Sequence, residues 1–76
     1  MTGHTSYVNT LCSLGNDIFA SGSRDNTIKI WRVSTGELIN TINGHTDYIR
    51  TLCSLGNDIF ASGSYDETIK IWRVIN

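Results

Sequence analysis

Two histidines of this sequence are each followed by serines and an aspartate, the residue types of a hydrolytic triad. His4 precedes Asp25, and His45 precedes Asp66. In a triad the aspartate orients the imidazole, and the imidazole takes the proton of a serine nucleophile. Here each set also contains a tryptophan, which a triad does not need, and the same set occurs twice. We therefore expect structural hydrogen-bond networks and no catalytic residues.

The other reactive side chains give no sign of a metal or cofactor. Cys12 and Cys53 are equivalent positions of a repeated unit, and we expect small buried thiols that are too far apart for a disulfide. The cysteines and histidines lack the paired spacing of zinc sites. Gly22 and Gly63 lie inside apparent strands, where glycine usually marks a bulge or close packing rather than a phosphate-binding loop. We expect neither metal nor cofactor.

The elements that must hold these side chains belong to one unit that is present almost twice. At an offset of 41 residues, Gly3–Val33 matches Gly44–Val74 at 26 of 31 positions. The segment Ser34–Asn43 occurs only once. We therefore divide the chain into one repeat over residues 1–43 and a second over residues 44–76, which lacks the last part of the unit.

Each repeat is composed of short β-branched and apolar runs separated by Gly, Asn, Asp and Ser, which predicts an all-β protein. Thr27–Val33 has apolar residues on both sides, as expected of a strand that is buried on both faces. The sequence predicts four strands in the first repeat and three in the second: Tyr7–Leu14, Ile18–Ser23, Thr27–Val33, Glu37–Ile42, Tyr48–Leu55, Ile59–Ser64 and Thr68–Val74.

In these features the chain resembles the WD-repeat β-propeller family. Both repeats have a Gly-His pair, an Ala-Ser-Gly-Ser strand, a following aspartate and an Ile-Lys-Ile-Trp strand, at a period typical of that family. The resemblance implies two four-stranded antiparallel blades around a central channel, the second without its outer strand. The family's Trp-Asp dipeptide is replaced by Trp31-Arg32 and Trp72-Arg73, which should leave the fold intact.

The resemblance also implies a hydrogen-bonded set of His, Ser, Asp and Trp in each blade. Ser23 and Ser64 are the alternatives for the serine. The positions that match the family pattern are His4, Ser21, Asp25, Trp31, His45, Ser62, Asp66 and Trp72.

Two blades are fewer than the four to eight of a closed propeller. A single chain would leave Leu11, Ile28 and Ile30, or their copies, in water. A few hundred Å² of such surface costs several kcal/mol at about 25 cal/mol per Å², comparable with the whole stability of so short a chain. We expect copies of the chain to join head to tail into a closed ring. A tetramer with eight blades is favoured over a trimer with six.

The five differences between the repeats lie where the inner strand begins and at the turn between the second and third strands. The resemblance places both regions on the end of the ring that family members often use for partners. Two interpretations stay open: neutral change at exposed positions, or a protein- or peptide-binding site. The candidate residues of such a site are Tyr7, Asn9, Arg24, Tyr48, Arg50 and Tyr65.

The sequence thus predicts a non-enzymatic, self-assembling WD-repeat scaffold, with a partner-binding adaptor as the alternative. Seven acidic and six basic residues give a net charge of −1, so we expect no nucleic acid and no membrane as partner. The chain has no long apolar run, and its first residues lack the pattern of a signal peptide. We expect a soluble, cytoplasmic (intracellular) protein, or one made recombinantly.

Overall fold

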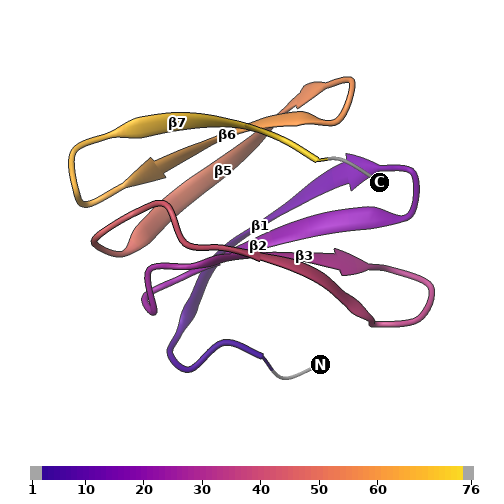
Figure 1. Cartoon of the computed structure of the whole chain (residues 1–76), viewed down its shortest axis with the longest axis horizontal. Coiled ribbons are helices and arrows are strands. Elements are labelled where there is room, and N and C mark those ends of the chain that lie inside the picture. Colours follow the sequence, from indigo (N-terminus) through magenta and orange to yellow (C-terminus); the bar gives the residue numbers. More distant parts are fainter. Residues whose placement is uncertain (1–2, 75–76) are drawn as a thin grey trace.

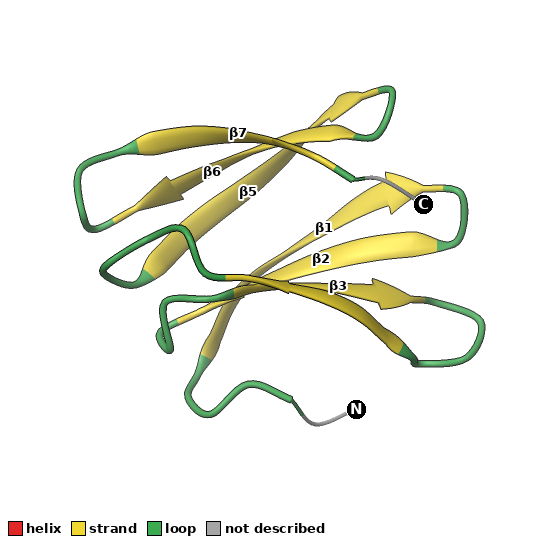
Figure 2. Ribbon diagram, in the orientation of Figure 1, coloured by secondary structure: helices red, strands yellow, loops and turns green. Residues whose placement is uncertain are grey.

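Residues 3–74 are described by the computed structural model, and they form seven β-strands with no helix among them (Figures 1 and 2). The all-β prediction is confirmed, and every strand lies within one residue of its predicted bounds. Within the described residues no helix is long and apolar enough to span a membrane. The strands are β1 (Val8–Gly15), β2 (Ile18–Ser23), β3 (Ile28–Arg32), β4 (Leu38–Ile42), β5 (Ile49–Gly56), β6 (Ile59–Ser64) and β7 (Ile69–Arg73).

The strands form two antiparallel sheets, one for each repeat. The first sheet has the order β1-β2-β3-β4 and the second has the order β5-β6-β7. Equivalent strands pair in the same register: Phe19 lies opposite Trp31 in the first sheet, as Phe60 lies opposite Trp72 in the second. The expected repeats at residues 1–43 and 44–76 include two residues at each end of the chain that lie outside the described range.

Residue types that tolerate a left-handed backbone make the tight turn between the first two strands of each sheet. Asn16 and Asp17 have φ values of 51° and 67°, and Asn57 and Asp58 have 53° and 63°. Two consecutive positive φ values suit a tight hairpin whose twist matches that of its strands, and Asn and Asp accept them more readily than other side chains. The Gly-Asn-Asp signals therefore close both hairpins.

Each sheet has two chemically different faces. We call the face that carries Trp31 or Trp72 the tryptophan face. The opposite face, the isoleucine face, carries two isoleucines of the third strand, which are Ile28 and Ile30 or their copies Ile69 and Ile71.

The two sheets lie one above the other in Figure 1, and the core lies between the isoleucine face of the first sheet and the tryptophan face of the second. Burying one large apolar side chain contributes about 1.5–3 kcal/mol, so this layer is the main source of stability. Gly22 has no room for a side chain, because a Cβ there would overlap Cγ2 of Ile49. The buried apolar residues of the layer are Ile18, Ala20, Ile28, Ile30, Ile49, Leu52 and Phe60.

The same stacking leaves the two outer faces uncovered, so equivalent residues differ sharply in exposure. Ile28 is 1% exposed and its copy Ile69 is 78% exposed. Conversely, Leu52 is 8% exposed and its copy Leu11 is 65% exposed. The expectation that a single chain leaves apolar residues of both outer faces in water is confirmed.

The prediction of buried cysteines was wrong. Cys53 is exposed and Cys12 is only partly buried, and both are free thiols. They belong to β1 and β5, each of which is an edge strand of its sheet, so their outer side is open. Partial burial raises the pKa of the Cys12 thiol.

Replacing Glu67 by Asn should raise the free energy of unfolding by about 0.5–1 kcal/mol. Glu67 has a φ of 70°, a left-handed conformation that asparagine tolerates better, and its copy in the first sheet is Asn26 with a φ of 72°. Urea unfolding of Glu67→Asn measures the gain. Glu67→Gln removes the same charge and keeps the unfavourable backbone, so it should give no gain; an equal gain in both variants would rule out the backbone as the cause.

Candidate functional site

A chain of buried hydrogen bonds joins four elements of the first sheet. Trp31 Nε1 donates to Ser21 Oγ at 2.8 Å, and Ser21 Oγ lies 2.6 Å from His4 Nε2. His4 Nδ1 lies 2.9 Å from Asp25 Oδ2. With the imidazole protonated on Nδ1, the serine donates to the histidine and the histidine donates to the carboxylate, so every polar atom is satisfied. The network ties the segment before β1 to β2, to the β2–β3 turn and to β3.

The second sheet repeats this network almost atom for atom. Trp72 Nε1 donates to Ser62 Oγ at 2.7 Å, Ser62 Oγ lies 2.7 Å from His45 Nε2, and His45 Nδ1 lies 2.9 Å from Asp66 Oδ2. The structure thus places the eight residues that the resemblance implied in two networks of four, one in each sheet.

The alternative serines, Ser23 and Ser64, form hydrogen bonds within the turns instead. Ser23 Oγ accepts from the Asp25 backbone N–H at 3.1 Å, and Ser64 Oγ accepts from the Asp66 backbone N–H at the same distance. They hold the β2–β3 and β6–β7 turns that present the carboxylates to the histidines.

The two aspartates are held in the charged form. Burial opposes the charge of Asp25, but hydrogen bonds from Thr27, His4 and the Thr5 backbone outweigh it and hold the pKa of this carboxyl well below its ordinary value. For Asp66 the hydrogen bond from Thr68 is the largest cause, burial opposes it, and the pKa is likewise held well below the usual range. Such carboxylates serve as fixed acceptors at neutral pH.

The distances between Ser, His and Asp satisfy a triad, but the surroundings of the serine hydroxyl suit a structural bond. Ser21 and Ser62 are buried, and each Oγ already accepts the indole N–H of a tryptophan. A nucleophile must be accessible to a substrate carbon, and these two serines are only 3% and 1% exposed. The geometry therefore favours anchoring of the tryptophan ring over acyl transfer.

The tryptophan face of the first sheet is hollowed. A cavity of about 440 Å³ is lined by Val8, Leu11, Phe19 and Trp31, with His4 and Ser21 at its polar side. In the second sheet the copies of these apolar residues are covered by the isoleucine face of the first sheet. The cavity thus lies where, on the second sheet, the isoleucine face of the first sheet packs.

Five of the six candidate partner-binding residues form one row of aromatic rings and guanidinium groups, the Tyr–Arg surface (Tyr7, Arg24, Tyr48, Tyr65 and Arg50). The Arg24 guanidinium lies 5.4 Å from the ring centre of Tyr7 and 5.5 Å from that of Tyr48, so it bridges the two sheets. The rings of Tyr48 and Tyr65 are 5.8 Å apart, and Arg50 lies 5.0 Å from the ring of Tyr65. These are cation–π and aromatic distances.

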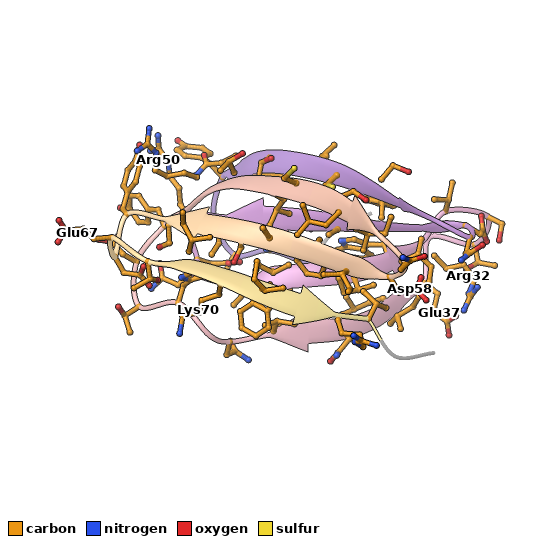
Figure 3. The ribbon with its side chains drawn as sticks, turned by 90° about the horizontal axis from the view of Figure 1, so that it is seen from above. Arg32, Glu37, Arg50, Asp58, Glu67 and Lys70 are labelled. Atoms are coloured by element: carbon orange, nitrogen blue, oxygen red, sulfur yellow. The ribbon has the colours of Figure 1, made fainter. Side chains whose placement is uncertain are left out.

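This row lies at one end of the molecule. Figure 3 places Arg50 and Glu67 at that end, and Arg32, Glu37 and Asp58 at the opposite end. The sixth candidate, Asn9, is engaged in the contact between sheets, because its side-chain N–H donates to the Ile49 carbonyl at 2.8 Å.

Comparison with known proteins agrees with this geometry. The family model described as "WD domain, G-beta repeat" (WD40) matches residues 1–32 and 36–73. The chain belongs to the WD-repeat family. Its two antiparallel sheets, which have four and three strands within residues 3–74, are called the first and second blade below, after the β-propeller fold of this family.

Several WD-repeat relatives and solved structures are similar to this chain. It is 54% identical over 39 residues to the WD repeat-containing protein pop2 of Schizosaccharomyces pombe, covering 51% of this chain and 5% of that protein. It is 43% identical over 44 residues to the pre-mRNA-splicing factor PRP46 of Kluyveromyces lactis, covering 55% of this chain and 10% of that protein. The chain thus spans a small part of the curated relatives it matches.

Among solved structures, U3-55K superposes with a TM-score of 0.90 at 28% identity, over 97% of this chain and 23% of that one. The computationally designed Ika4 protein superposes with a TM-score of 0.82 at 35% identity, over 95% of this chain and 44% of that one.

Sequence reasoning missed Thr27 and Thr68 as members of the WD-repeat networks. The Thr27 hydroxyl donates to Asp25 Oδ1 and lies 3.3 Å from His4 Nδ1; Thr68 does the same in the second blade with Asp66 and His45. The Asp-x-Thr spacing was the available signal, because an Asp side chain commonly bonds the residue two positions on.

The networks should make this WD-repeat protein sensitive to acid. Asp carboxyls in an unfolded chain titrate near pH 3.9, and those of Asp25 and Asp66 titrate lower in the folded chain. Their stabilisation is therefore fully present above about pH 4 and is lost as the pH falls through the lower, folded pKa. A double variant, Asp25→Asn with Asp66→Asn, should be less stable at pH 7 and should lose less stability between pH 7 and pH 3.

Urea unfolding across this pH range checks the prediction. The other carboxylates are present in both the original chain and the double variant, so they act as an internal control. Parallel pH dependences would show that the two aspartates contribute nothing to acid lability.

Proposed function

We propose that this chain is a non-enzymatic scaffold that builds a closed β-propeller from several copies of itself. The observation that carries the proposal is the complementary state of the blades. The isoleucine face is covered in the first blade and open in the second. The tryptophan face is covered in the second blade and open in the first. Since 26 of 31 repeat positions are identical, a face that fits within the chain also fits between chains.

The joining surfaces are the isoleucine face of the second blade and the tryptophan face of the first. On the former, Ile69 and Ile71 are exposed in the single chain, although their copies are fully covered. On the tryptophan face of the first blade, Leu11 and the cavity at Trp31 are open. Their counterparts in the second blade, Leu52 and Phe60, are covered by an isoleucine face. Covering these patches on both sides supplies the apolar burial that a single chain lacks.

The backbone of the second blade leaves room for this contact. Gly22 of the first blade lies directly against Ile49, whereas Gly63 has only Thr51 Cγ2, at 3.2 Å from an ideal Cβ position. A neighbouring chain's Val8 is the copy of Ile49, so it would take the open place over Gly63. Valine keeps the Cβ and Cγ atoms that Ile49 packs on glycine.

Two blades per chain give rings with even numbers of blades. We propose the tetramer with eight blades first and the trimer with six second. The pre-mRNA-splicing and ribosome-biogenesis proteins that are similar to this chain support an intracellular setting and protein partners.

Absolute mass in solution tests the ring. From 8.4 kDa per chain, a tetramer has a mass of about 34 kDa and a trimer about 25 kDa, both measurable by native mass spectrometry. A folded monomer at micromolar concentration would contradict the proposal.

Two single-site variants test which faces meet. Leu11→Glu places a charge on the open tryptophan face, and Ile71→Glu places one on the open isoleucine face. Each variant alone should be a folded monomer, because these positions are solvent-exposed in one chain but buried in the ring. Mixed one to one, they should form a dimer of about 17 kDa, twice the chain mass, since one intact face remains on each.

The matched control is Leu52→Glu, the covered copy of Leu11. This substitution buries a charge in the core of a single chain and should unfold it, as near-ultraviolet circular dichroism would show. A mixture of Leu11→Glu and Ile71→Glu that stays monomeric, with both proteins folded, would exclude the head-to-tail contact.

The second candidate function is peptide binding on the Tyr–Arg surface. Tyr7 and Tyr65 are more than half exposed, and exposed tyrosines beside arginines are favoured contact residues. Among residues 3–74, neither Arg24 nor Arg50 has a carboxylate partner within salt-bridge distance. The surface therefore favours peptides that carry carboxylates.

Acidic and basic octapeptides of matched length, titrated by fluorescence anisotropy, test this surface. The acidic peptide should bind more tightly, and Arg50→Ala with Tyr65→Ala should weaken it by about tenfold or more without changing the ring mass. Arg32→Ala, with the same loss of charge at the opposite end, is the control. Equal binding by both variants would sink the proposed site.

A further inference from the structure

Two of the positions at which the repeats differ carry polar side chains that cross from the first blade to the second. The Arg24 guanidinium lies 5.4 Å from the ring centre of Tyr7, in its own blade, and 5.5 Å from that of Tyr48 in the second blade. The Asn9 side chain donates to the Ile49 carbonyl at 2.8 Å. Both contacts thus reach the same point of the second blade, the start of β5.

The backbone holds both sides of the Arg24 contact in place. Arg24 N–H donates to the Tyr7 carbonyl at 2.9 Å, which fixes the point from which the guanidinium extends. In the second blade, Tyr65 N–H donates to the Tyr48 carbonyl at 2.9 Å, and the two rings lie 5.8 Å apart. Groups that are already in position lose little freedom when they meet, so more of their interaction is retained as stability.

The chemistry of the contact suits arginine in particular. Among residues 3–74, Arg24 has no carboxylate within salt-bridge distance, so the two rings are its main partners. A guanidinium is planar and can lie against aromatic rings, whereas an ammonium is a compact and strongly hydrated charge. Arg24 therefore joins two tyrosines of different blades through one side chain.

The copies of these residues in the second blade make a different contact. Tyr65 is the copy of Arg24, and Arg50 is the copy of Asn9. The Arg50 guanidinium lies 5.0 Å from the ring of Tyr65, within one blade. Each blade thus has one arginine at this end, which crosses to the next blade in the first case and stays on its own blade in the second.

We infer that Arg24 and Asn9 form a clamp that holds the second blade on the first, in which Arg24 binds the tyrosine that precedes β5 and Asn9 binds the next carbonyl. The apolar faces supply area but no direction, whereas a cation–π contact and a hydrogen bond depend on orientation. The clamp therefore fixes how the second blade is turned on the first. It lies within one chain, so the inference depends neither on ring formation nor on peptide binding.

A double-mutant cycle on the full chain, measured by thermal unfolding at a fixed chain concentration, tests the clamp. Arg24→Ala should lower the melting temperature by about 4–8 °C, because it removes both ring contacts from a chain of this size. In a Tyr48→Ala background the same substitution should lower it by about half as much, because the ring across the junction is already absent. Asn9→Ala should also lower the melting temperature, because it removes the bond to the Ile49 carbonyl.

Tyr65→Ala is the matched control background. It removes the same contact between Tyr48 and Tyr65 and leaves both rings of Arg24 in place, so Arg24→Ala should keep its full effect there. Arg24, Tyr48 and Tyr65 are all exposed, so these variants retain the buried core. An equal effect of Arg24→Ala in the original chain and in the Tyr48→Ala background, or an unchanged melting temperature in Arg24→Ala or Asn9→Ala, would overturn the inference.

Discussion

Stability in this protein depends on one contact, the packing of the isoleucine face of one blade on the tryptophan face of the next. Within residues 3–74, the contact contains the buried apolar cluster, with Ile28 and Ile30 on one side and Leu52 and Phe60 on the other. A three- or four-stranded sheet with apolar residues on both faces cannot stand alone in water, because each face needs a cover. The chain provides one such contact, and two faces remain open.

The buried networks serve this contact rather than compete with it. Trp31 and Trp72 belong to the tryptophan faces, and their indole N–H groups would be costly to bury without an acceptor. Ser, His and a low-pKa Asp form a relay that ends at a carboxylate near the surface, so each ring is fixed in place and its polar atom is satisfied. A rigid ring is what allows the next blade to pack closely.

Duplication explains why so small a chain has open faces and a Tyr–Arg surface together. Identical sequences at Ile28 and Ile69, or at Leu52 and Leu11, differ in burial only because of what lies beside them. The positions that do differ between repeats gather mainly at one end, where Arg24 bridges the blades and Arg50 stacks on Tyr65. The contacts between the faces are thus formed mainly by residues that are identical in the two repeats, whereas the Tyr–Arg surface includes positions at which the repeats differ.

The sequence alone determined the strands, the repeat and the family, because these depend on local patterns: alternation of apolar residues, Gly-Asn-Asp turns and motifs at a period of 41 residues. It also pointed to the eight network residues through that resemblance. Only the tertiary structure decided which copy of each residue is covered, that Ser21 rather than Ser23 joins the network, and that Asn9 belongs to the contact between blades. Cys53, which was expected to be buried, is exposed, and only the tertiary structure decided this as well. Burial is a property of neighbours in space, and two identical repeats have different neighbours.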